Sequence, residues 1–185
     1  PALFDLTSLQ REANSRFGFS AKTTLSIAQA LYEKHKVLTY PRTDSRALPE
    51  DYVATVKNTM KMIGEEDLPG PLRELAPHAK KALKEGYVKP VKRVFDNAKV
   101  SDHFAIIPTL QAPKSLTDIE LKLYDMVVKR FLAVFYPSAE FQVTTRITKV
   151  PALGAEQHFQ TNGKVLVNPG WLAVYGKEAQ DEDAT

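Results

Sequence analysis

The spacing of hydrophobic residues changes at Pro137, and this change constrains the fold more than any other feature. Before it, apolar residues recur three or four positions apart, as on one face of a helix. After it, Phe141, Val143 and Ile147 alternate with polar residues, as in a strand with one buried face. The sequence therefore predicts an α+β chain. A mainly helical domain over residues 1–137 precedes a small, partial antiparallel β segment over residues 138–185.

The amino-terminal part has the signals of two helices joined by a tight turn. Thr7 and Gln10 have the spacing of a capping box, which predicts a helix over residues 8–16. Gly18 supplies a left-handed stop and Ser20 can cap a second helix. Such a corner is a candidate helix-turn-helix for nucleic-acid binding. An ordinary helical corner explains the same pattern.

Further along, Thr117 and Glu120 repeat the capping-box spacing and predict a long buried helix that ends near residue 136. In the β segment, Asn162-Gly163 is a hairpin signal. It predicts a turn between strands at 156–161 and 164–167.

Composition excludes several classes of protein. The chain has 185 residues and no cysteine, which rules out disulfide scaffolds, thiolate zinc sites and cysteine nucleophiles. No apolar run approaches the roughly 18 residues of a membrane span, and the four histidines are scattered. We therefore expect no membrane association, no metal site within this chain, and a reducing, cytoplasmic setting.

Basic residues are concentrated between residues 79 and 99, in a chain of net charge +3. The positive side chains there are Lys80, Lys81, Lys84, Lys89, Lys92, Arg93 and Lys99. Such a stretch could hold a phosphate backbone. A solvated, lysine-rich surface loop is an equally good explanation.

A candidate for chemistry is Tyr40, followed two positions later by Arg42. In extended backbone the two side chains point to the same side, roughly 6.5–7 Å apart. A nearby cation favours the phenolate and stabilises charge on a phosphoryl transition state. The pair could therefore attack and hold one phosphate. A strand tyrosine beside a surface arginine is a common structural alternative.

Three separated motifs, in order, resemble the central part of the type IA DNA topoisomerases. They cover residues 3–33, residues 39–45 (Thr-Tyr-Pro-Arg-Thr-Asp-Ser) and residues 101–109 (Ser-Asp-His-Phe-Ala-Ile-Ile-Pro-Thr). Pro41 and the last motif are more similar to the topoisomerase III branch than to topoisomerase I. The match is loose over residues 50–99.

The resemblance implies roles for six residues. Tyr40 would be the nucleophile that forms a 5′-phosphotyrosyl link with single-stranded DNA, without ATP. Arg42 and His103 would complete the catalytic set by contacting the scissile phosphate. The expected DNA-binding residues are Arg16, Lys22 and Asp102.

The resemblance also implies a fold and partners. We expect residues 1–137 to form a winged-helix-like (CAP-like) domain carrying Tyr40, and residues 138–185 to contribute strands of an arch. The expected partners are single-stranded DNA and the other domains of the same polypeptide, in the bacterial nucleoid. Mg²⁺ would be held by an acidic Toprim domain that has no counterpart in this sequence. We therefore expect the chain to be a fragment that cannot relax DNA alone.

The alternatives are a non-catalytic helix-turn-helix binding module, a scaffold domain and, within the family, reverse gyrase.

Overall fold

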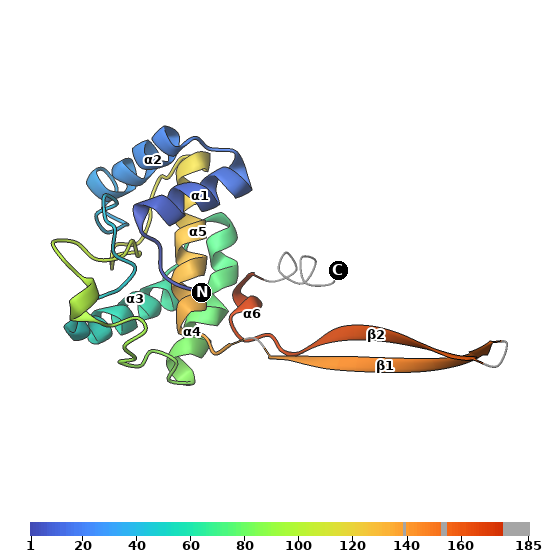
Figure 1. Cartoon of the computed structure of the whole chain (residues 1–185). Coiled ribbons are helices and arrows are strands. Elements are labelled where there is room, and N and C mark those ends of the chain that lie inside the picture. Colours follow the sequence, from blue (N-terminus) through green and yellow to red (C-terminus); the bar gives the residue numbers. More distant parts are fainter. Residues whose placement is uncertain (139, 153–154, 176–185) are drawn as a thin grey trace. The chain divides into compact units, whose positions relative to one another are not determined.

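The computed structural model describes the backbone of residues 1–138, 140–152 and 155–175, and the side chains of residues 1–138 and 169–175. The chain divides into two compact units, Pro1–Tyr136 and Pro137–Thr185. The first unit is mainly helical, as predicted (Figure 1). Its α-helices are α1 (Leu6–Phe17), α2 (Ala21–Glu33), α3 (Val53–Glu65), α4 (Ala76–Lys84) and α5 (Asp118–Phe135).

Helix α5 is the centre of this unit. Its predicted capping box is confirmed: the Glu120 amide donates to the Thr117 hydroxyl at 3.3 Å, and the Thr117 amide donates to the Glu120 carboxylate at 2.9 Å. Most of its apolar side chains are buried, and Tyr124 and Phe131 are among the largest fully buried residues. Helices α2 and α4 both pack against it (Figure 1). The buried α5 therefore connects α2 with α4.

Helix α1, the first helix of the corner with α2, begins earlier than predicted. The N-cap of α1 is Asp5, whose carboxylate accepts from the Ser8 amide at 2.8 Å, so the predicted Thr7–Gln10 box is wrong. Aspartate is as good a cap as threonine and lies two residues earlier, which starts the helix sooner. The Gln10 amide instead donates across the corner to the Ala21 carbonyl at 3.1 Å.

The turn and the second cap are confirmed. Gly18 ends α1 with a left-handed φ of 71°, a conformation that costs other residues energy. The Ser20 hydroxyl then accepts from the Thr23 amide at 3.1 Å and starts α2. The corner is therefore fixed by backbone hydrogen bonds at both helix ends.

Between the helices, extended loops pair over only one or two residues. Three isolated bridges join Phe4 to Ile106, Leu38 to Pro108, and Leu48 to Phe95. Short 3₁₀ turns at Glu50–Tyr52, Gly70–Leu75 and Asn97–Lys99 complete the connections. The first bridge ties the segment before α1, and the other two tie the segment before α3, to the segment between α4 and α5.

The second unit contains an antiparallel pair, β1 (Glu140–Ala152) and β2 (Ala155–Asn168), and a short helix α6 (Leu172–Tyr175). The predicted turn at Asn162-Gly163 is wrong here, because these residues pair with Thr145 and Thr144 within the ladder. Pairing of β1 along its whole length with one long β2 satisfies more backbone groups than pairing between two short strands at 156–161 and 164–167 would. Among the described residues, no helix is long and apolar enough to cross a membrane.

Candidate active site

Tyr40 follows a short extended segment that a distant loop holds in place. The Thr39 amide donates to the Ile107 carbonyl at 3.0 Å. The Thr39 hydroxyl donates to the Ala105 carbonyl and accepts from the Ile107 amide, each at 3.0 Å. One threonine thus joins the two extended segments through three hydrogen bonds. This segment forms no longer strand and has one isolated bridge, between Leu38 and Pro108.

This pairing brings the sequence-predicted Tyr40 and His103 together. Their ring centroids lie 4.1 Å apart with 32° between the ring planes. The Tyr32 ring, from α2, contacts Tyr40 nearly edge-on with centroids 5.3 Å apart. Tyr40 is half-buried and His103 is exposed. The phenol therefore lies between two rings at the surface of the unit.

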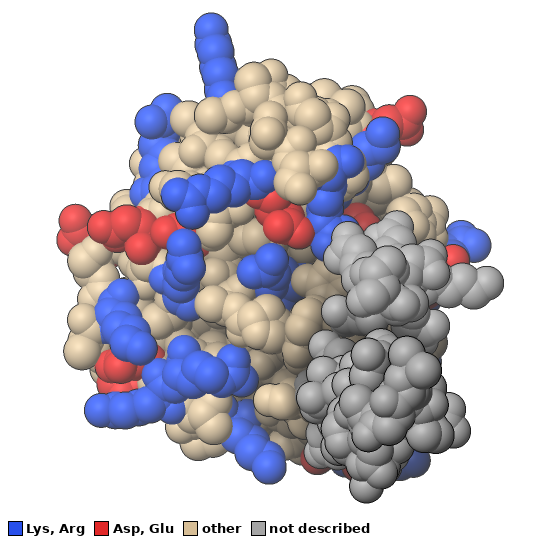
Figure 2. Space-filling view, turned by 45° about the vertical axis from the view of Figure 1, so that its right-hand side comes forward, with Lys and Arg blue, Asp and Glu red and all other residues tan. Residues whose placement is uncertain are grey.

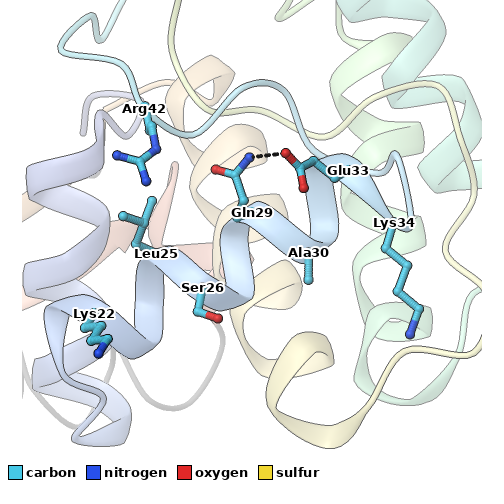
Figure 3. A pocket seen from close by; sticks show the side chains of 8 residues that line it. All are labelled: Lys22, Leu25, Ser26, Gln29, Ala30, Glu33, Lys34 and Arg42. Carbon is cyan, nitrogen blue, oxygen red and sulfur yellow. Dashed lines mark hydrogen bonds between the residues drawn. The ribbon is translucent and has the colours of Figure 1, made fainter.

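Lys22 lies on α2, and Arg42 lies in the loop that follows Tyr40. Both line an open hollow of about 500 Å³ that runs along one face of α2 (Figure 3). Arg42 projects over Leu25 in this view, and Lys22 lies one turn earlier on the helix. The hollow also contains the Gln29 amide, which donates to the Glu33 carboxylate at 2.8 Å. With Lys34, three cations therefore line one surface groove beside the segment that carries Tyr40.

Arg16 and Asp102 are placed less directly. The Arg16 guanidinium pairs with the Glu12 carboxylate on α1 at 2.6 Å. Asp102 is exposed and precedes His103 in the chain.

The residues after Arg42 form a buried hydrogen-bonded frame. The Thr43 hydroxyl accepts from the Ser45 amide at 3.1 Å, and the Ser45 hydroxyl donates to the Lys99 carbonyl at 2.7 Å. The Ala47 amide donates back to the Ser45 hydroxyl at 3.2 Å. Ser45 therefore fixes the loop that follows the candidate nucleophile.

Three other tyrosines have pKa values that disfavour a phenolate. Burial raises the pKa of Tyr124 far above its ordinary value. Burial, together with the neighbouring Tyr87, raises the pKa of Tyr136 to about 12. Burial and the negative charge of Asp51 raise the pKa of Tyr52. These side chains are poor nucleophiles.

The basic stretch is partly structural. The Arg93 guanidinium donates to the Val134 carbonyl at 2.8 Å and to the Pro1 carbonyl at 3.3 Å, so it supports the fold. Lysine and arginine side chains are nonetheless spread widely over the face shown in Figure 2. No cluster of three or more acidic or histidine side chains that could hold a metal ion occurs among the described residues.

Sequence reasoning did not assign a role to Tyr32. Its position beside the buried Leu31 gives no periodic signal, because it falls off the apolar face of α2. The contact between the Tyr32 and Tyr40 rings is visible only in the folded chain, where the segment around Thr39 pairs with the segment around Ile107.

The sequence model of the DNA topoisomerase family matches residues 1–185. The chain belongs to this family. It is 47% identical to DNA topoisomerase 3 of Bacillus cereus over 187 aligned residues, which cover all of this chain and 24% of that protein. It is 46% identical to DNA topoisomerase 3 of Bacillus subtilis, over 99% of this chain and again 24% of the relative.

A solved structure agrees with this assignment. Full-length topoisomerase I from Thermotoga maritima matches with a TM-score of 0.62 and 26% identity, over 95% of this chain and 27% of that chain. The resemblance to topoisomerase III-like type IA enzymes is therefore confirmed. The chain spans about a quarter of the length of these relatives.

Proposed function

We propose that this chain is the segment of a type IA topoisomerase that carries the nucleophile, Tyr40. Its hydroxyl oxygen attacks a phosphodiester of single-stranded DNA and forms a 5′-phosphotyrosyl bond. The bond to the 3′ oxygen breaks, and that oxygen takes up a proton as the phenol loses one. Religation reverses both steps, so one phosphodiester is conserved and no ATP is consumed.

The observation that carries this proposal is the contact of Tyr40 with His103 in a chain of this family. The pairing of Thr39 with Ala105 and Ile107 presents both rings at the surface, within reach of a bound strand. An exposed imidazole beside the phenol suits a residue that contacts the phosphate under attack. Burial disfavours Tyr52, Tyr124 and Tyr136 for the same role.

Arg42 and Lys22 supply positive charge on the neighbouring groove along α2 (Figure 3). A guanidinium can hold two phosphate oxygens and stabilise charge that develops in the transition state. We assign Arg42 to the scissile phosphate and Lys22 to the adjoining DNA backbone. Arg16 and Asp102 remain expected DNA contacts at the edges of this surface.

The complete reaction needs parts of the enzyme outside this chain. The relatives are about four times as long, and the described residues offer no acidic cluster that fits Mg²⁺. We therefore place a Mg²⁺ requirement in a Toprim domain elsewhere in the polypeptide. In the same proposal, residues 1–137 form the winged-helix-like domain and residues 138–185 belong to the arch of an enzyme that acts on nucleoid DNA.

The test is Tyr40→Phe in the complete topoisomerase, measured by relaxation of supercoiled plasmid and by trapping of covalent DNA adducts. Both activities should fall below detection while binding of single-stranded DNA remains. Tyr87→Phe is the matched control, because Tyr87 packs on Tyr136 instead of on the site. Retained cleavage by Tyr40→Phe would exclude Tyr40 as the nucleophile. If the complete topoisomerase and its Tyr40→Phe variant both bound DNA and neither cleaved it, the alternative of a non-catalytic binding module would stand.

A further inference from the structure

A second hollow lies beside Tyr32, and the proposed reaction does not use it. It has a volume of about 540 Å³ and is lined by Tyr32, Glu33, Lys36, Leu38 and Thr109. This volume is in the usual range for small-molecule pockets, about 300–1,000 Å³. Its lining combines an aromatic ring, a cation and hydrogen-bonding groups.

Tyr32 connects this hollow to the candidate nucleophile. Its ring touches Tyr40, with the centroids 5.3 Å apart, yet 36% of the residue is exposed. The other large apolar residues with comparable exposure among the described side chains are aliphatic: Val91, Leu110 and Ile119. An exposed aromatic ring beside a phosphate-attacking residue is suited to stacking on a base.

The rim of the hollow is held rigidly. Lys36 has a left-handed φ of 56°, an unfavourable conformation for a residue with a Cβ atom. The Thr109 hydroxyl donates to the Lys36 carbonyl at 2.6 Å, and the Thr109 amide donates to the Val37 carbonyl at 2.9 Å. Strained residues that the surrounding structure fixes in this way cluster at ligand-binding sites.

The charges favour a base over a phosphate as the occupant. The Glu33 carboxylate on one wall, held by the Gln29 amide, repels an anion but can accept from the amino group of a base. The Lys36 ammonium on the same hollow can pair with the DNA backbone that leads to the base.

We propose that this hollow is a nucleobase subsite, in which a base of the nucleotide next to the attacked phosphate stacks on Tyr32. The subsite rests on the proposed function, because it places that nucleotide beside Tyr40. Tyr32 and Glu33 bind the base, and Lys36 neutralises the adjoining backbone. Binding at this position fixes the strand before the covalent step.

The experiment uses the complete topoisomerase with Tyr40→Phe, so that binding is measured without cleavage. The probe is a single-stranded oligonucleotide that contains a preferred cleavage site, with one base at a time replaced by an abasic nucleotide. Tyr32→Leu should weaken binding by about 5- to 150-fold, the range for loss of one stacked base. An abasic nucleotide at one position beside the cleavage site should weaken binding in the protein with Tyr32 and have no further effect in Tyr32→Leu.

Tyr32→Phe keeps the aromatic ring and should retain both the affinity and the abasic effect, which separates stacking from a folding defect. Ile119→Ala on α5 is a matched control for loss of an exposed apolar side chain. The proposal is overturned if Tyr32→Leu binds every oligonucleotide as tightly as the protein with Tyr32. It is also overturned if the abasic effect survives in Tyr32→Leu. Cleavage by Tyr40→Phe would refute the proposed function in a separate measurement.

Discussion

At the scale of single residues, Ser45 shows how the site depends on buried polar groups. Its side chain is 5% exposed and makes hydrogen bonds with the backbone of Lys99 and Ala47. One buried side chain therefore fixes the loop after Tyr40.

Ser45→Ala should lower the free energy of unfolding by about 1–3 kcal/mol, because it removes the hydroxyl partner of a part-buried carbonyl and a buried amide. Urea denaturation of the purified chain measures this change. Ser26→Ala is the control, since Ser26 is exposed on α2 and its replacement should change stability by less than about 0.5 kcal/mol. Equal stability of the two variants would show that water replaces the Ser45 hydroxyl.

The sequence proposed residues for the site but not the contacts that hold them together. The motif spacing singled out Tyr40, Arg42 and His103, and the structure brings two of them into ring contact. No sequence pattern predicted that Thr39 would form the link, because its partners lie 66 and 68 residues later. Pairing at such separation depends on the folded chain and is invisible to local periodicity.

At the scale of elements, a buried pair joins the end of α2 to the start of α5. The His35 ring nitrogen Nε2 lies 3.0 Å from the Glu120 carboxylate, and each side chain is 10% exposed. Burial acts to raise the pKa of Glu120, but hydrogen bonds from Thr117 and His35 outweigh it, so its pKa lies below the ordinary value of 4.5. The α2 end that this pair anchors leads directly into the segment carrying Tyr40.

A lowered carboxylate pKa stabilises the fold above the unfolded-state pKa, and this contribution is lost as the pH falls below about 4.5 toward the folded-state pKa. Glu120→Gln keeps a side-chain acceptor for the cap but removes the charge. It should therefore be less stable than the parent at about pH 7, and the difference should shrink toward about pH 3. Urea midpoints at both pH values test this, with exposed Glu74→Gln as the control. A difference that does not change with pH would contradict the prediction.

Element boundaries followed the sequence where a cap was unambiguous. The start of α5 at Thr117 and the end of α1 at Gly18 were predicted correctly. The start of α1 was predicted too late, because Thr7 and Asp5 both have capping signals and Asp5, the earlier of the two, is the N-cap. The turn predicted at Asn162-Gly163 was wrong, because a local hairpin signal is overridden when a longer strand is available as a partner.

At the scale of the whole molecule, charge and chain length limit what the 185-residue chain can do alone. The net charge is only +3, and the cations that face the α2 groove are few. We expect weak, nonspecific binding of single-stranded DNA and no relaxation of plasmid with added Mg²⁺. Relaxation by the purified chain would overturn our placement of the metal site in another domain.

The binding itself should depend on salt. With about two or three phosphate contacts, affinity for a single-stranded oligonucleotide should fall about tenfold between roughly 50 and 200 mM salt. Fluorescence anisotropy at several salt concentrations measures the slope. The double variant Lys22→Gln, Arg42→Gln should flatten it, whereas Lys122→Gln, exposed on α5, should not. A slope unaffected by the double variant would place the DNA on another face.

The three hydrogen bonds of Thr39 also have a consequence for biosynthesis. Their partners, Ala105 and Ile107, leave the ribosome long after Tyr40 itself has been translated. A growing polypeptide that has reached only α3 cannot yet hold the phenol against its imidazole neighbour. The candidate site therefore cannot assemble in the nascent protein until most of the first unit has been made.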